Sequence, residues 1–441
     1  MQMLISSPSA FGPSVVRRFW FSIASTSLVR VYALAASLMS VMITARWLGP
    51  GGQGIVAAAT TWASLFASLG SLSLGQVAIH RATERRNEAW LGETLGTLMA
   101  LAAVISIGCW SASFVLFKVT SGKIFTHLAP RTIVLAFVLV PFVVWEFYGS
   151  NLLMAVDKVE VYNKAQLVGR SIGLALMVVC WRLQLSADAA IVIAVISQAA
   201  VSILGMRQLF AEAAKAVRAR MVVAKELLVG GLKLHMNAVG SFVFIWLAIL
   251  LVNQFRGPVQ TGLYQFASSL LNVLLVIPTA ASLVLSARVA KDGPLHAWAY
   301  HRRVLIYLTM VMIAVGAIAA VAAPVAIRIV VGPKYDPAVP LFQLLLFSLV
   351  GQTFAGIMGS QWIGRGLFWQ MSALTIFTSS VHAAMSFLWI PRYGMYGAVY
   401  ASLVTSGLAI IGNGTFALIC ESQFRQFMRE REDLAMSGDI A

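Results

Sequence analysis

Long apolar runs constrain this chain more than any other feature of its sequence. Runs of about 20 residues recur from Phe19 to Cys420, and each could carry a helix across roughly 30 Å of hydrocarbon. Of the 441 residues, 59% are hydrophobic and 11% are charged, so the chain needs lipid as its solvent. The short alternating segments of a transmembrane β-barrel are missing from the sequence. The sequence therefore predicts an all-α membrane protein.

Charged residues, Gly and Pro divide the apolar runs into twelve predicted transmembrane helices. Their approximate ranges are 20–45, 53–79, 91–117, 132–156, 162–181, 187–206, 232–255, 262–286, 304–331, 339–363, 369–390 and 395–420. Twelve crossings place both chain ends on the same side. With the N-terminus inside, 21 Lys and Arg residues fall in inner segments and 9 in outer loops. The positive-inside rule then predicts that both termini are cytoplasmic.

The N-terminal segment resembles a signal peptide only in part. Arg17 and Arg18 precede the first apolar run, but that run continues to about Ala45. We therefore expect a first transmembrane helix that stays attached to the protein.

The net charge of +16 does not indicate a nucleic-acid partner, because the basic residues are scattered between apolar runs and form no compact patch. The three cysteines lie far apart, with no CxxC motif. The six histidines have no spacing typical of metal ligands. The sequence thus predicts no metal site and no cofactor.

An internal repeat gives the architecture of the chain. Residues 48–61 read LGPGGQGIVAAATT and residues 256–269 read RGPVQTGLYQFASS, aligned without a gap at an offset of 208. The matched positions include Gly49, Pro50 and Gly54 in the first copy and Gly257, Pro258 and Gly262 in the second. Because Pro presets φ and Gly accepts a positive φ, we interpret both copies as structural turns between consecutive helices.

The repeat predicts two six-helix lobes related by a pseudo-two-fold axis along the membrane normal, since an even number of spans per half preserves orientation. The expected divisions are an N-terminal lobe over 1–206, a cytoplasmic linker over 207–231, a C-terminal lobe over 232–420 and a cytoplasmic tail over 421–441. The linker carries several basic residues and an apolar face. An interfacial helix on the inner leaflet and a solvated linker helix remain alternatives.

The hairpin sequence at 45–81 resembles the first hairpin of Wzx-type polysaccharide flippases, in the multidrug/oligosaccharidyl-lipid/polysaccharide superfamily. Residues 327–366 and 389–406 are similar to spans nine to twelve of that family, with IPRYGMYGAVYA at 390–401 as the most recognisable segment. The resemblance implies a V-shaped pair of lobes that alternates between inward-open and outward-open states. The implied substrate is an O-antigen or exopolysaccharide repeat unit linked to undecaprenyl diphosphate. Multidrug exporters and the lipid II flippase belong to the same superfamily.

A flippase for such a substrate needs cations in a hydrated cavity within the bilayer. Arg30 in span one and Arg170 in span five lie deep in their spans, where a charge facing lipid would be costly. A guanidinium fork matches phosphate oxygens, so both are candidate ligands of the diphosphate. The alternative is an ion pair with Glu146, the one carboxylate clearly within a predicted span. The two readings are compatible if the phosphate displaces Glu146.

A second group of candidates begins span seven. Lys233 and Asn237 are four residues apart on one helix face, and His235 lies between them in sequence. They are candidates for the cytoplasmic mouth of the cavity. The alternative is an interfacial lysine with polar flanks and a structural histidine.

The expected function is transport of a lipid-linked oligosaccharide within the lipid bilayer, by a protein that is not an enzyme and that works as a monomer beside polysaccharide polymerase and export machinery. A cation-coupled drug exporter is the alternative within the same fold, but carboxylates are scarce in the spans. From another class, a membrane-embedded polysaccharide polymerase or ligase would need a large outer loop, and the longest outer loop here is only 118–131. A scaffold within an assembly complex is a further alternative.

Overall fold

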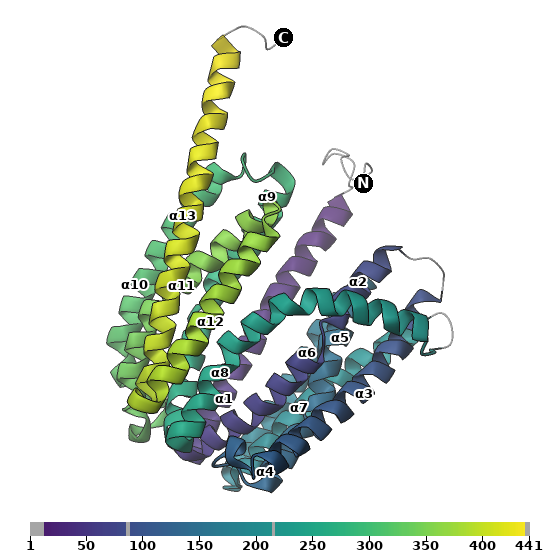
Figure 1. Ribbon diagram of the computed structural model, residues 1–441, viewed down its shortest axis with the longest axis vertical. Coiled ribbons are helices and arrows are strands. Elements are labelled where there is room, and N and C mark those ends of the chain that lie inside the picture. The colour runs from purple at the N-terminus through teal and green to yellow at the C-terminus, as the bar shows by residue number, and fades with distance from the viewer. Residues whose placement is uncertain (1–12, 85–88, 214–216, 437–441) are drawn as a thin grey trace. The chain divides into compact units, whose positions relative to one another are not determined.

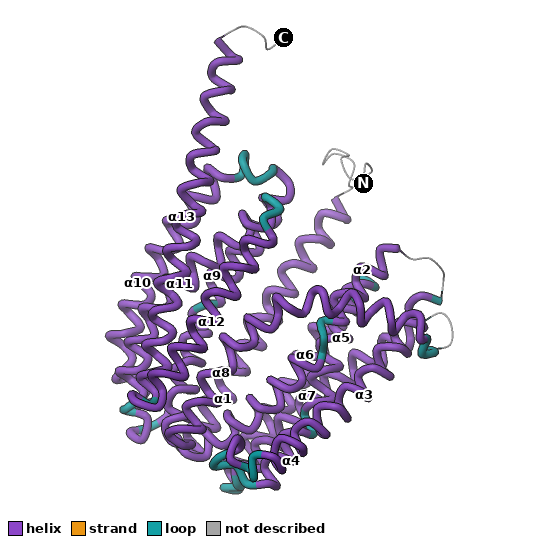
Figure 2. The backbone as a smooth tube through the Cα atoms, in the orientation of Figure 1, coloured by secondary structure: helices purple, strands orange, loops and turns teal. Residues whose placement is uncertain are grey.

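The computed structural model describes the chain except for residues 1–12, 85–88, 214–216 and 437–441. Within the described residues, helices make up all the regular structure and no strand is present (Figure 2). The helices are α1 (Pro13–Gly70), α2 (Leu74–Glu84), α3 (Trp90–Val119), α4 (Pro130–Phe137), α5 (Val140–Ala155), α6 (Val159–Arg182), α7 (Ala187–Glu212), α8 (Met221–Leu274), α9 (Val276–Asp292), α10 (Trp298–Val331), α11 (Ala338–Gly364), α12 (Phe368–Tyr393) and α13 (Met395–Met436). Two short 3₁₀ helices, η2 (Lys123–Phe125) and η3 (Pro333–Tyr335), join α3 to α4 and α10 to α11.

The predicted all-α membrane architecture is confirmed. Among the described residues, nine helical segments are long and apolar enough to cross a bilayer, or ten if the bent pair Ala35–Gly70 and Leu74–Ala82 is one span. This number is lower than twelve for two reasons. It leaves out much of the first predicted span, whose side chains lie outside the described residues, and the seventh and eighth predicted spans fall in the single segment Trp246–Asp292. Each of the twelve predicted ranges falls on helix, with short interruptions in three of them.

Proline explains one of these interruptions. The fourth span breaks between α4 and α5, just ahead of Pro141. Because Pro lacks an N–H and its ring crowds the preceding turn, the carbonyl of Phe137, four residues earlier, has no helical donor. The indole Nε1 of Trp110 on α3 donates to that carbonyl at 2.8 Å. A side chain from the neighbouring helix thus satisfies a backbone group that lipid could not.

The chain divides into two compact units. Unit 1 contains residues 1–43, 66–116 and 130–235, and unit 2 contains residues 44–65, 117–129 and 236–441. In unit 1 the main helix contacts are α6 with α7, α2 with α5 and α5 with α7, whereas in unit 2 α11 packs on α9, α10 and α13, and α12 packs on α13. Figure 1 shows α13 continuing as one straight helix past α10, α11 and α12.

One span forms the centre of each unit. In the window of Pro130–Ala155 and in that of Ala338–Gly364, 56% of the residues are buried, compared with 17–33% in the other candidate spans. These are the fourth and the tenth predicted spans, which occupy equivalent places in the two sequence repeats. Protein therefore surrounds these two spans, while the others expose most of their apolar surface, as lipid-facing helices do.

Candidate functional site

A polar cluster lies inside unit 1 around Glu146 of α5. The Glu146 carboxylate accepts hydrogen bonds from the Tyr162 hydroxyl at 3.0 Å and from Gln166 Nε2 at 2.5 Å, both on α6. Gln198 Nε2 of α7 donates to its other oxygen. Gln166 Nε2 also donates to the Tyr162 hydroxyl at 2.9 Å. Neutral donors from two helices therefore hold the carboxylate, and its negative charge is not cancelled by any of them.

Arg170 lies one helical turn beyond Gln166 and borders this cluster. The two residues share a face of α6, and the charge of Arg170 is close enough to act on the Tyr162 hydroxyl. Within the described part of the chain, the guanidinium makes no hydrogen bond and no ion pair, including none with Glu146, and its Nε is fully buried. A buried donor without an acceptor costs about 1–3 kcal/mol, and more when it is charged. This geometry leaves the fork of Arg170 open to an anionic ligand.

A hydrogen bond of 2.5 Å between the Tyr32 and Ser171 hydroxyls brings α1 against α6 beside Arg170. Arg30 precedes Tyr32 by two residues in α1, and its side chain lies outside the described residues. The backbone thus brings the neighbourhoods of the two sequence-predicted arginines together in unit 1.

His235 contacts an interruption in the second span that the sequence did not reveal. Between α1 and α2, Leu72 and Ser73 adopt left-handed φ angles of 48° and 55°. Ser73 Oγ lies 3.2 Å from Nδ1 of His235, which is 6% exposed. The Tyr148 hydroxyl donates to the Ser71 carbonyl at 2.9 Å. The histidine therefore packs on a broken helix, and the only local sequence signal is the small-residue string GSLSLG at 70–75.

Lys233 and Asn237, the other candidates near the start of span seven, have side chains outside the described residues. Both belong to α8, which starts at Met221 within the predicted linker. The first part of that linker continues α7 as far as Glu212.

An ion-pair network attaches the start of α8 to the ends of α2 and α3. Arg81 pairs with Glu226 and, at 3.7 Å, with Glu93. Arg220 Nη1 lies 3.0 Å from the same Glu93 carboxylate, and its backbone N–H donates to Thr97 Oγ1 at 3.0 Å. Glu93 is 8% exposed, so its charge needs both arginines. The network fixes this part of the linker to unit 1.

The two copies of the Gly-Pro repeat have the same backbone conformation. Gly49 has φ 65° and ψ −178°, and Gly257 has φ 80° and ψ −179°, values that favour glycine. In each copy a Pro follows, as the first residue of the next helical segment, where its missing N–H costs nothing.

The second glycine of each copy allows the two copies to touch. A Cβ on Gly54 would lie 1.8 Å from the Pro258 carbonyl oxygen, and a Cβ on Gly262 would lie 2.0 Å from the Pro50 carbonyl oxygen. The contact is reciprocal, since each glycine faces the proline of the other copy. The sequence predicts turn residues at both positions, and in the structure Gly54 and Gly262 lie in close backbone contact within unit 2.

Polar contacts around these corners are reciprocal as well. Just before the second copy, Asn253 Nδ2 donates to the Thr126 carbonyl at 2.9 Å and Gln254 Nε2 donates to the Lys123 carbonyl at 2.8 Å, beside η2. Just before the first copy, Arg46 Nη1 donates to the Val330 carbonyl at 3.2 Å, ahead of η3. The Tyr335 hydroxyl of η3 donates to Gln53. We call these hydrogen bonds and the glycine contact together the repeat corner. In it, each half of the chain donates hydrogen bonds at the 3₁₀ helix of the other half, or accepts one from it.

Among the side chains that the structure describes, no group of three or more His, Cys, Asp or Glu residues could hold a metal ion.

Comparison with known proteins gives a family and a fold. The family described as polysaccharide biosynthesis protein matches residues 43–340. No curated protein matches the chain by sequence. Among solved structures, the lipid II flippase MurJ in an inward closed conformation has a TM-score of 0.72 at 11% identity, covering 88% of this chain and 86% of that one. An inward-facing multidrug resistance MATE family transporter of the MOP superfamily has a TM-score of 0.67 at 14% identity, covering 90% and 99%.

A third solved structure is also similar. A MOP superfamily transporter from Pyrococcus furiosus, whose reversed binding-pocket polarity is said to suggest a different function, has a TM-score of 0.59 at 15% identity, covering 90% and 96%. At these identities the similarity shows a shared fold.

Proposed function

The chain belongs to the polysaccharide biosynthesis protein family, and on this premise we propose that it is a flippase for a polyprenyl-diphosphate-linked oligosaccharide. It moves this O-antigen or exopolysaccharide repeat unit from the cytoplasmic to the periplasmic leaflet of the bacterial inner membrane by alternating access. It works as a monomer with both termini in the cytoplasm, beside polymerase and export machinery.

The unpaired guanidinium of Arg170 carries this proposal. A cation within a membrane span is normally paired or functional, and within the described residues Arg170 has no partner. A diphosphate offers several oxygens with the geometry of the guanidinium fork, so it would satisfy donors that the protein leaves open. Arg30, on the helix that Tyr32 holds against α6, supplies a second cation to the same anion.

The Glu146 cluster supplies polar groups that can bind the sugar part of the substrate. Gln166 and Gln198 direct amide nitrogens at Glu146, and their remaining amide groups suit the hydroxyls of a glycan. The carboxylate also lowers the affinity of Arg170 for the diphosphate, because its negative charge lies nearby. This balance allows release after transport. In this proposal Lys233 and Asn237 belong to the cytoplasmic entrance, and His235 supports the broken second span.

In this proposal the repeat corner is the part of unit 2 that rearranges during transport. Gly54 packs against the Pro258 carbonyl and Gly262 packs against the Pro50 carbonyl. Each of the two 3₁₀ loops is held by hydrogen bonds from the other half of the chain. Alternating access requires these contacts to break when the outer side opens. Hydrogen bonds to backbone carbonyls suit this role, because each contributes little alone.

The decisive experiment measures flipping of a fluorescent polyprenyl-diphosphate oligosaccharide by the full chain in proteoliposomes. We expect Arg170→Ala to reduce the initial rate about 10- to 100-fold and Arg170→Lys to restore part of it, since Lys keeps the charge but loses the fork. Arg182→Ala, at the exposed end of the same helix, is the matched control and should leave the rate unchanged. Normal flipping by Arg170→Ala at equal protein level would remove Arg170 from the site and with it the main support for the proposal.

A cation-coupled drug exporter of the same fold is the second candidate. Glu146 favours it, because a half-buried carboxylate held by neutral donors suits a cationic ligand. Glu146→Gln separates the two functions. It should abolish drug efflux in an exporter, but it should leave a flippase active and tighten its binding of diphosphate.

A further inference from the structure

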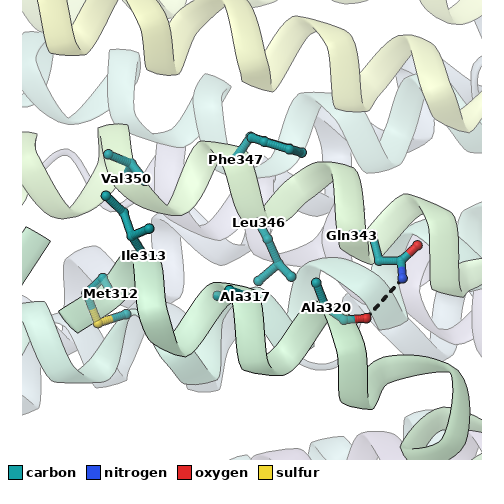
Figure 3. A pocket seen from close by; sticks show the side chains of 9 residues that line it. Met312, Ile313, Ala317, Ala320, Gln343, Leu346, Phe347 and Val350 are labelled. Atoms are coloured by element: carbon teal, nitrogen blue, oxygen red, sulfur yellow. Dashed lines mark hydrogen bonds between the residues drawn. The ribbon is translucent and has the colours of Figure 1, made fainter. Parts of the chain in front are cut away.

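An apolar groove runs between α10 and α11 in unit 2 (Figure 3), with a volume of about 400 Å³. On α10, Gly316, Ala317 and Ala320 leave the space, because their side chains are small. On α11, Leu346 and Phe347 form the opposite wall. The two helices pack against each other but leave this stretch unfilled.

The polar group in the wall of the groove is already satisfied. Gln343 Nε2 donates to the Ala320 carbonyl at 2.9 Å, as the dashed line in Figure 3 shows. That carbonyl is free because Pro324, four residues later, has no N–H to offer. The groove therefore presents hydrocarbon to any occupant.

The surroundings of the groove decide what fills it. Val321 and Ile318 of α10 are 82% and 70% exposed, and Phe347 beside the groove is 71% exposed. Such side chains cover the face of a span that lies in the acyl region of a bilayer. An open apolar groove on this face contacts the acyl chains of the bilayer. Its small lining residues leave enough space for one acyl chain.

Arg328 lies where the headgroup of such a lipid would be. Arg328 is exposed, and among the described residues its side chain has no hydrogen bond or ion pair. It follows Ala317 by eleven residues, which is three helical turns, roughly 16 Å along α10 and about 20° around it. Since α10 ends at Val331, Arg328 occupies the polar boundary of the span. The Arg328 charge and the groove thus lie on one face of α10. Their separation matches the distance from the headgroup of a phospholipid to the middle of its acyl chain.

We propose that this face of α10 and α11 is a binding site for one anionic membrane phospholipid. Its phosphate pairs with Arg328, and one acyl chain lies in the groove between Ala317 and Phe347. The site is independent of the transport activity, because it lies on the lipid-facing surface of unit 2 and uses none of the residues around Glu146.

Photo-crosslinking tests the chain position. The full chain is placed in nanodiscs that contain phosphatidylglycerol with a diazirine at mid-chain, and the labelled peptides are mapped by mass spectrometry. We expect label on 312–320 and 343–350, and a loss of about fivefold when Ala317→Phe fills the groove. Ala322→Phe is the matched control, since it adds the same ring at an exposed position of α10 outside the groove. Label spread evenly over the exposed helix faces, or label unaffected by Ala317→Phe, would overturn the proposal.

Headgroup competition tests the role of Arg328. Unlabelled phosphatidylglycerol should displace the probe about five times better than phosphatidylcholine, and Arg328→Gln should remove that preference. Arg392→Gln, an exposed cation at the end of α12, should preserve it. An unchanged preference in Arg328→Gln would refute the headgroup assignment. Displacement by polyprenyl phosphate at far lower concentration than phosphatidylglycerol would refute the phospholipid and identify a carrier-lipid site instead.

Discussion

Gln343 of α11 donates its side-chain amide to the carbonyl of Ala320 on α10, and that carbonyl lacks a helical donor because of Pro324. Trp110 does the same for Phe137, four residues before Pro141. In lipid no water reaches a free carbonyl, so a proline within a span needs a donor from an adjacent helix. The two contacts join α10 to α11 and α3 to α4, and they explain why a glutamine and a tryptophan N–H occur within apolar spans.

The double replacement of Gln343 and Pro324 tests this relationship. Gln343→Leu should lower the free energy of unfolding by about 1 kcal/mol, because the Ala320 carbonyl loses its donor. In a Pro324→Ala background the same change should cost much less, since residue 324 then supplies the helical N–H. Thermal unfolding of the four proteins in detergent measures the coupling. Equal costs in the two backgrounds would contradict it.

The repeat corner predicts unequal effects of the same small substitution. Gly54→Ala and Gly262→Ala should each lower stability by about 3 kcal/mol or more, because the new Cβ would overlap a backbone carbonyl that cannot move away alone. Gly51→Ala lies in the same helical segment and would meet a Val259 methyl group at an ordinary 3.6 Å. It should be neutral or slightly stabilising. Thermal melting of the three variants decides, and a Gly54→Ala variant as stable as Gly51→Ala would show that the two repeat copies do not touch.

Much of the fold was predictable from run length alone. The all-α class and the helical spans follow from apolar runs that only a bilayer accommodates, and the offset of 208 identified two segments with equal backbone conformation. The interruption at Leu72 and Ser73 was harder to predict, because no proline marks it and its local signal is only the small-residue string at 70–75.

Side-chain partners at the candidate site were less predictable. Sequence depth placed Arg170 and Glu146 inside spans, but it could not tell which way each side chain turns. In the structure Tyr162, Gln166 and Gln198 hold Glu146, and Arg170 stays outside this set of partners. Polar residues scattered over three helices give no local pattern. Only the packing of α5, α6 and α7 brings them together.

The ion-pair network of the linker predicts a strong effect of one arginine. Arg81→Ala should destabilise unit 1 by about 2–3 kcal/mol, because Glu93 and Glu226 then keep their charges with Arg220 as the remaining nearby cation. The additional change Glu226→Gln should recover part of the loss by removing one of the two negative charges. Proteolysis of the linker after Glu212, followed over time, reports the release of the docked segment. A cleavage rate equal to that of the unaltered protein would show that the network does not hold the linker.

The interruption of the second span depends on Tyr148, which is fully buried in α5 and donates to the Ser71 carbonyl. Tyr148→Phe keeps the ring and removes only the hydroxyl donor, so the Ser71 carbonyl at the break is left with the Leu74 N–H at 3.2 Å. The expected cost is about 1 kcal/mol. Because the affected residues surround the break and not the whole unit, hydrogen exchange should speed up at 69–75 before any change appears in α6 or α7. Tyr162→Phe, which removes a hydroxyl from the Glu146 cluster on α6, is the control and should leave exchange at 69–75 unchanged. Uniform acceleration across unit 1 in Tyr148→Phe would mean that the hydroxyl stabilises the unit as a whole and does not specifically hold the break.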